Sequence, residues 1–215
     1  MIKQNLEKIK QQLPSEVNLV VVSKFRTIDE LKEVYDTGHL DFAENRVQEM
    51  LSKYEQMPKD INWHLIGHLQ SNKVKYIAPF VGLIHSVDSL ELAEEISKQA
   101  IKNNRVISIL IQFHVAQEVS KFGLNPDCSE TICKQILSLS NINIRGVMGM
   151  ATFTSDEALI RTEFHILKSI FDNLKVKHFA DKKTFNTISM GMSSDYKIAI
   201  EEGSTMVRIG SLVFE

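Results

Sequence analysis

A lysine directly after an apolar run is the first residue of this sequence that could carry chemistry. Leu19 to Val22 form the run, and Ser23, Lys24 and Phe25 follow it. Such a run is typical of a buried strand, which would place Lys24 where the strand meets the protein surface. A lysine desolvated at that point could act as a nucleophile toward a carbonyl group. The alternative is that Lys24 caps the strand and extends into water, as most lysines do.

Polar residues also follow the second apolar run. Glu44, Asn45 and Arg46 come directly after Asp41 to Ala43. They would join Lys24 in one polar set if the two strands end side by side. The same cluster is also typical of a helix start, where acidic side chains lie near the positive end of the helix dipole.

Two histidines have the spacing of paired metal ligands on a helix. His64 and His68 lie four residues apart, but Gly67 lies between them and a β-type run precedes them. We therefore do not expect a helix here, and no acidic residue stands where a zinc-binding helix would carry one. We expect no metal site, and we interpret His64 as a core histidine with a hydrogen-bonded ring.

The last two predicted strand ends have the features of a phosphate site. Gly191 and Ser193 precede a helix expected to start near Asp195, while Gly210 and Ser211 follow the final apolar run. Glycine lets the backbone approach a phosphate closely, and the N–H groups at a helix start favour an anion. In β/α barrels a phosphate often lies between the loops after strands seven and eight.

Arg208 precedes this last loop by two residues. It is therefore expected to face the interior of the fold while the loop holds a phosphate. The alternative is a structural ion pair between Arg208 and a carboxylate.

These residues need a scaffold that brings the strand ends together. Short β-rich runs alternate with helical patterns such as Asp29 to Asp36 and Ser89 to Lys102, and Thr27 and Ser89 lie where helix N-caps are expected. Repeated β-α units imply parallel strands. The eight predicted strands are Asn18 to Val22, Asp41 to Ala43, Asn62 to Ile66, Leu83 to His85, Val106 to Phe113, Asn143 to Met148, Thr184 to Ser189 and Thr205 to Arg208.

Eight parallel strands form either an open sheet or a closed barrel. Their near-even spacing, without a long excursion, favours an α/β fold of the (β/α)8 TIM barrel type. The chain has 215 residues and no linker rich in Pro, Gly or Ser. We therefore predict a single domain over residues 1–215, with an N-terminal helix before the first strand.

Composition and charge exclude several classes of protein. The formal net charge is −2 with the basic residues dispersed, so we expect no nucleic-acid partner. No apolar stretch approaches the roughly 20 residues that span a bilayer, and the N-terminus lacks a signal core, so a cytoplasmic location is expected. Cys128 and Cys133 match no metal or redox spacing and are expected to be structural thiols.

The motifs that contain these residues occur in a characteristic order: VSK, ENRVQE, WHLIGHLQSNK, SVDS, EVSKFG, GVMGMA, SMGMSSDYKIAI and VRIGS. As a set, from about residue 18 to the C-terminus, they resemble the YggS/PROSC family of pyridoxal phosphate homeostasis proteins. The resemblance implies an eightfold barrel similar to the N-terminal domain of alanine racemase, with pyridoxal 5'-phosphate (PLP) as cofactor.

The resemblance also implies a role for each candidate residue. Lys24 matches the lysine that carries PLP as a Schiff base, and Arg208 matches the arginine that approaches the pyridine nitrogen. Asn45 matches an asparagine that lines the pocket. The phosphate-binding positions of the family are matched by Ser193, Gly210 and Ser211.

The chain departs from the family pattern at three places. Ala43 stands where the family usually has glycine, His114 stands where asparagine is common, and the usual glycine after the terminal Phe214 is absent. We expect the first two departures to reshape the mouth of the pocket.

An arginine cannot protonate the pyridine nitrogen, so the ring would be a weak electron sink. The chain also ends soon after the last predicted strand, without a second domain like that of alanine racemase. The leading hypothesis is therefore a monomeric protein that holds PLP and delivers it to apo-enzymes without catalytic turnover.

Two alternatives use the same residues. One is a PLP-dependent amino-acid racemase or related enzyme in which His64 or Tyr196 donates a proton. The other is a class I aldolase in which Lys24 attacks a sugar-phosphate carbonyl and needs no cofactor.

Overall fold

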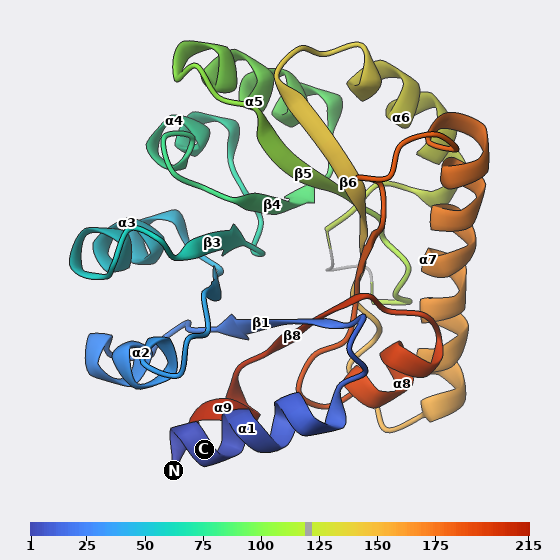
Figure 1. The fold of residues 1–215 in the computed structure, drawn as a ribbon. Helices are drawn as coiled ribbons and strands as arrows, with labels where there is room; N and C mark the ends of the chain where they lie inside the picture. Colours follow the sequence, from blue (N-terminus) through green and yellow to red (C-terminus); the bar gives the residue numbers. More distant parts are fainter. Residues whose placement is uncertain (119–121) are drawn as a thin grey trace.

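The structure is a computed structural model that describes residues 1–118 and 122–215. Within these residues, eight parallel strands follow one another around a closed barrel, and β8 pairs with β1 (Figure 1). The predicted (β/α)8 barrel is thus confirmed. The strands are β1 (Asn18–Val22), β2 (Asp41–Glu44), β3 (Asn62–Leu65), β4 (Leu83–Val87), β5 (Ile107–Gln112), β6 (Ile142–Met148), β7 (Thr187–Ser189) and β8 (Met206–Ile209).

Helices connect the strands and cover the outside of the barrel. The N-terminal helix α1 packs against the last helix α9, and Figure 1 shows the two side by side near both chain ends. The helices are α1 (Ile2–Gln12), α2 (Ile28–Tyr35), α3 (Val47–Gln56), α4 (Val74–Ile77), α5 (Leu90–Lys102), α6 (Ser129–Leu137), α7 (Glu157–His178), α8 (Tyr196–Glu201) and α9 (Ser211–Phe214), with 3-10 turns η1 (Ser71–Lys73) and η2 (Pro126–Cys128).

Both predicted helix caps form. Thr27 accepts a hydrogen bond from the backbone of Glu30, whose carboxylate accepts one from Thr27 in return, which completes a capping box at the start of α2. Ser89 accepts from Leu92 N–H at the start of α5. These caps begin the helices immediately after the loops and so keep the loops at the barrel mouth short.

The seventh predicted strand is three residues longer than the strand that forms. The prediction began at Thr184, but β7 begins at Thr187, because the preceding residues turn instead of extending. In that turn Phe185 N–H donates to the carbonyl of Lys182, and the Phe185 ring stacks on Phe179 in the outer core. Phe185 therefore packs at the end of α7 and does not belong to the strand.

Alternation along the strands divides the core into two layers. Outward residues such as Trp63, Val207 and Ile209 pack beneath the helices, whereas Val20, Leu83 and Met206 belong to a smaller cluster inside the barrel. The interior cluster is small because polar side chains share the same space. These buried polar residues, at the inward positions of β3, β4, β7 and β8, are His64, His85, Ser189 and Arg208.

No helix in the described part of the chain combines the length and apolar character needed to cross a membrane. Both cysteines are free. Cys133 is buried, and burial raises the pKa of its thiol to about 12, so this thiol is unreactive.

His39 is a buried histidine just before β2, and its titration reports on the packing there. Its ring is buried against Phe42, and its Nε2 donates to the carbonyl of Asp41. Burial, together with the positive charge of Lys10, lowers the pKa of His39 to about 4. An unfolded histidine binds a proton near pH 6.5, whereas folded His39 stays neutral, so its contribution to stability is lost as pH falls from 6.5 toward 4.

We therefore expect His39 to reduce the free energy of unfolding by about 2 kcal/mol between pH 8 and pH 5. Urea unfolding of the wild type and of His39→Gln at both pH values measures this. The glutamine keeps a donor for the Asp41 carbonyl but does not titrate, so the variant should lose about 2 kcal/mol less than the wild type over this range. Equal losses would contradict the prediction.

Candidate cofactor-binding site

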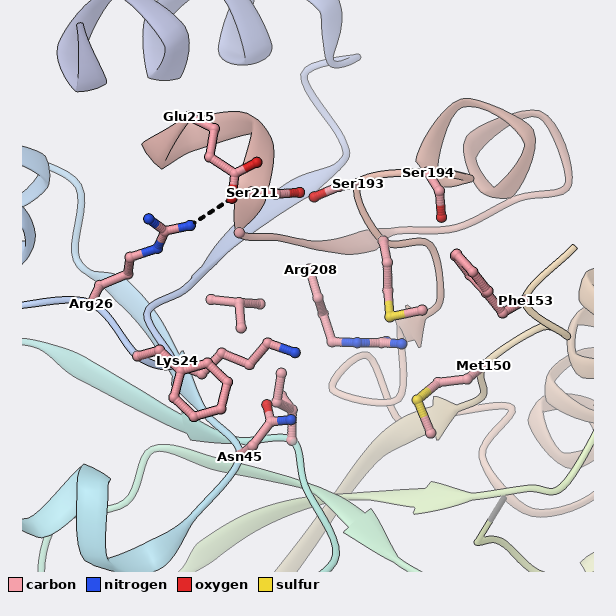
Figure 2. Close-up of a pocket in the computed structure, with 15 residues that line it drawn as sticks. Lys24, Arg26, Asn45, Met150, Phe153, Ser193, Ser194, Arg208, Ser211 and Glu215 are labelled. Atoms are coloured by element: carbon pink, nitrogen blue, oxygen red, sulfur yellow. Dashed lines mark hydrogen bonds and ion pairs between the residues drawn. The ribbon is translucent and has the colours of Figure 1, made fainter. Parts of the chain in front are cut away.

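A cavity of about 710 Å³ opens at the carboxyl ends of the strands (Figure 2). The six residues selected from the sequence all line it: Lys24, Asn45, Ser193, Arg208, Gly210 and Ser211. They come from the loops after β1, β2, β7 and from β8 with its following turn. Because all strands are parallel, their carboxyl ends meet at one rim, which is why residues so distant in sequence share a cavity.

Lys24 is solvent-exposed and its side chain extends into the cavity. Protein does not desolvate this lysine, so its exposure agrees with the alternative in which Lys24 extends into water. The next residue, Phe25, has φ +63°, a left-handed conformation that is strained for a bulky side chain. Arg26 N–H donates to the carbonyl of Ser23 and closes a tight turn around this residue.

A buried ion pair supports the backbone beside Lys24. Lys53 of α3 donates to Glu44 Oε1 at 2.5 Å and to the carbonyl of Ser23 at 2.6 Å, and Ser23 Oγ donates to the same carboxylate oxygen at 2.6 Å. Burial raises the pKa of Glu44, although the hydrogen bonds from Lys53 and Ser23 oppose this effect. Glu44 is thus neither a cavity residue nor a helix-start charge; it anchors the end of β1 through Ser23.

Asn45 has an unused acceptor. Its Oδ1 is buried and has no hydrogen-bond partner within residues 1–118 and 122–215. A buried amide oxygen without a partner is costly, and it fits a cavity in which a bound group supplies the missing donor. Gly67 approaches the Asn45 backbone closely, since a Cβ on Gly67 would lie 2.2 Å from the Asn45 carbonyl oxygen.

The backbone of the loop after β7 allows a ligand in the cavity to approach closely. Gly191 has φ +96°, which favours glycine, and Met192 N–H donates to Asp195 Oδ1 at 2.6 Å. Asp195 N–H and Tyr196 N–H both donate to the carbonyl of Met192. These bonds close the loop on itself, and in the described part of the chain no acceptor contacts the N–H group of Ser193.

The loop after β8 lies against β1. A Cβ added to Gly210 would lie 3.0 Å from the carbonyl oxygen of Val22, so glycine permits this approach. Ser211 begins α9, where the first N–H groups have no partner within the helix. Figure 2 shows the Ser193 and Ser211 side chains together at one side of the cavity. Donors on two adjacent loops that have no acceptor among residues 1–118 and 122–215 fit a phosphate group.

Arg208 lies beneath the cavity and is 3% exposed. Its Nη1 donates to Ser189 Oγ at 2.6 Å, and its Nη2 donates to the carbonyl of Gly149 at 3.1 Å. Burial lowers the pKa of Arg208 to about 10, partly opposed by the charge of Asp195. The hydrogen-bond acceptors of Arg208 in the described residues are thus a hydroxyl and a carbonyl, which favours the interior-facing interpretation over a direct ion pair.

The two departures expected to reshape the pocket mouth do not line the cavity. Ala43 is buried inside the barrel beside Val20 and Val22. His114 lies after β5, and its Nε2 hydrogen-bonds to the carbonyl of Glu118 at 2.9 Å. The expectation is therefore wrong for both residues: Ala43 lies below the cavity, and His114 braces a loop.

The proposed proton donors of the racemase alternative also lie outside the cavity lining. His64 is buried inside the barrel and forms a hydrogen bond with His85. Tyr196 directs its hydroxyl to Gln12 of α1 at 2.8 Å.

Several functional candidates were missed from the sequence. Arg26 and Ser194 adjoin selected residues, and Met150 and Phe153 follow β6, so inspection of every strand end would have included them. Lys53 was missed for another reason. It lies within a helix and reaches the strand end only because α3 packs against β2 and β3.

Comparisons with known proteins agree with this fold. The family model for the N-terminal domain of alanine racemase matches residues 1–215. An alanine racemase of Clostridium difficile superimposes with a TM-score of 0.83 over 99% of this chain and 59% of its own, at 16% identity, which concerns the fold alone. Fold and site together define a barrel of the alanine racemase N-terminal domain class.

Relatives of higher sequence identity identify the family to which the chain belongs. The pyridoxal phosphate homeostasis protein of Aquifex aeolicus is 40% identical over 197 residues, which cover 91% of this chain and 85% of the relative. That of Schizosaccharomyces pombe is 33% identical over 217 residues, covering 97% and 90%. PipY of Synechococcus elongatus, solved with PLP bound, has a TM-score of 0.90 and 32% identity, with 100% of both chains covered. The chain belongs to the family of pyridoxal phosphate homeostasis proteins, the YggS/PROSC family.

The buried pair beneath Lys24 can be tested by substitution. Lys53→Met would leave the Glu44 carboxylate buried without its cation, so we expect it to lower the free energy of unfolding by about 3–5 kcal/mol. Replacing both partners, as Lys53→Met with Glu44→Leu, should recover most of this loss, since no charge then remains buried. Urea unfolding measures both variants, and a single variant within about 1 kcal/mol of wild type would refute the assignment.

Proposed function

We propose that this protein binds PLP as a Schiff base on Lys24 and contributes to the homeostasis of intracellular PLP. The observation that carries the proposal is the cavity itself, which brings an exposed lysine, a buried arginine and two donor-rich loops to one rim. The names of its relatives and the PLP bound to PipY support the same assignment.

Each part of the cofactor has a matching group in the cavity. We assign the phosphate to Ser193, Gly210 and Ser211, where free donors and close backbone approach coincide. Lys24 would hold the aldehyde carbon, and Asn45 Oδ1, which lacks a partner within the described residues, would accept a hydrogen bond from the ring substituents. Arg208 would face the ring nitrogen.

Arg208 favours holding the cofactor over turning over amino acids. When bound to an amino acid, PLP withdraws electrons from the Cα position, and it does so best with a protonated ring nitrogen. A guanidinium donates hydrogen bonds and keeps its proton. Arg208 would therefore leave the ring nitrogen unprotonated, and we assign no catalytic turnover to the protein.

The recipients of the cofactor in this proposal are apo-enzymes that use PLP, and the protein acts as a cytoplasmic monomer. Two large apolar side chains at the cavity, Phe25 and Phe153, are 75% and 83% exposed. Exposed aromatic side chains at the mouth of a site are suited to contact with another protein.

The visible spectrum tests the central assignment. Wild-type protein mixed with PLP should develop a yellow band that borohydride shifts, with the reduced adduct mapping to Lys24. Lys24→Ala should lack the band, whereas Lys32→Ala, which removes an exposed lysine outside the cavity, should retain it. A wild-type protein that stays colourless would overturn the proposal. Trapping on Lys24 that requires a sugar phosphate would favour the aldolase alternative.

A second prediction concerns the phosphate loops. Ser193→Ala or Ser211→Ala should each weaken PLP binding about tenfold, the loss expected for one hydrogen bond to a charged group. Binding of pyridoxal, which lacks the phosphate, should not change. Titrations followed by absorbance measure both ligands for each variant. Equal effects on PLP and pyridoxal would place the phosphate elsewhere.

A further inference from the structure

A line of polar side chains crosses the barrel interior from Arg208 to the opposite end. Arg208 Nη1 lies 2.6 Å from Ser189 Oγ, which lies 3.0 Å from His85 Nδ1. His85 Nε2 lies 2.9 Å from His64 Nδ1, and His64 Nε2 lies 3.1 Å from Asp41 Oδ1. We call these residues the interior column. They come from β8, β7, β4, β3 and β2.

The column is enclosed by protein except at its far end. Ser189 and His85 are fully buried and His64 is nearly so, whereas the Asp41 side chain is 40% exposed. Asp41 begins β2, so it lies at the end of the barrel opposite to the cavity. Four buried polar residues in one barrel interior are costly unless each hydrogen bond is made.

If both histidine rings are neutral, the two ends of the column set the direction of every bond in it. Arg208 can only donate and the Asp41 carboxylate can only accept. Ser189 Oγ therefore accepts from Arg208 and donates to His85 Nδ1. His85 Nε2–H then donates to His64 Nδ1, and His64 Nε2–H donates to Asp41. Asn62 Nδ2 lies 2.9 Å from His64 Nε2, and in this arrangement it donates to Asp41 Oδ1 at 2.6 Å and not to the ring. In this arrangement both rings carry their single proton on Nε2.

The charges around the column support this state. Burial lowers the pKa of His85 well below its ordinary value, and the charge of Arg208 acts in the same direction. Burial alone would raise the pKa of Asp41, but hydrogen bonds from His64 and Asn62 outweigh it and lower the pKa. The Asp41 carboxylate, at the far end of the column, thus stays a hydrogen-bond acceptor.

Protonation of either ring would break the pattern. A protonated His64 would donate from Nδ1 to His85, which would then donate from Nδ1 to Ser189. Ser189 Oγ would accept from both sides, and its own proton would lose its acceptor. Two other titratable groups lie at the ends of the column: His39, which is beside Asp41, and Asp195, whose charge acts on Arg208.

We propose that Ser189, His85 and His64 are positioning residues that hold the Arg208 guanidinium against the cofactor ring and keep its charge there. The proposal rests on the proposed function for the identity of the ring. Nη1 and Nη2 are held by Ser189 and Gly149, so the plane of the guanidinium is fixed on two sides. Without Ser189 Oγ, one of these anchors is lost and the guanidinium is free to rotate away from the cavity.

The first experiment needs no cofactor. Nitrogen NMR of protein labelled at histidine should show His64 and His85 as neutral rings protonated at Nε2 between pH 6 and pH 8. In Ser189→Ala, the Nδ1 signal of His85 should move because its donor is gone. A proton on Nδ1 of either ring in the wild type would overturn the column as described.

The second experiment uses PLP-loaded protein and the pH midpoint of its visible band. A positive charge near a Schiff base disfavours the protonated form. Release of Arg208 in Ser189→Ala should therefore raise the midpoint, by about half a pH unit or more. Ser189→Thr keeps the hydroxyl and should restore the wild-type value. Ser204→Ala is the matched control, since Ser204 is also buried but donates to the carbonyl of Met190, outside the column.

The two experiments separate the column from the proposed function. If the wild type forms no band with PLP, the proposed function fails, while the NMR result still decides whether the column exists. If the band forms and Ser189→Ala has the same midpoint as the wild type and Ser204→Ala, the positioning role is refuted.

Discussion

The ladder between β1 and β8 is the contact on which the site depends. It closes the barrel and sets Val20 opposite Arg208 and Val21 opposite Ile209. In this register the turn at Gly210 lies against Val22. Lys24 and the loop after β8 therefore share one rim of the barrel. A shift of the register by one residue would turn Arg208 out of the interior and separate it from Lys24. Backbone pairing therefore positions the chemistry before any side chain does.

The interior of this barrel combines packing with a polar function. Barrels of this class are usually filled by branched apolar side chains in layers. Here the apolar cluster is reduced, and Arg208, Ser189 and two histidines occupy inward positions. Their hydrogen bonds offset the cost of burial only when all are made in one consistent direction. Such a network stabilises less than an apolar core would, but it defines where a buried positive charge lies.

The residues around Lys24 show the same division between support and contact. Glu44 and Lys53 hold the strand end from the helical side of the barrel, while Asn45 keeps a buried acceptor without a partner among the described residues at the cavity. Phe25 adopts a strained backbone at the next position. Buried pairs, unsatisfied acceptors and strain reduce stability, and in folded proteins they collect where a ligand is bound. Their concentration at one strand end is consistent with the proposed cofactor site.

Local patterns were sufficient for much of this protein. Alternating β and α runs predicted the barrel, the caps at Thr27 and Ser89 predicted helix starts, and the strand-end rule with the family motifs selected six residues that line one cavity. These features depend on residues near one another in sequence. Tertiary structure alone decided the exposure of Lys24, the interior position of Ala43, the Lys53 to Glu44 pair and the column through His85. Each of these depends on which strands and helices meet across the closed barrel, because burial and hydrogen bonding are set by neighbours that no local pattern contains.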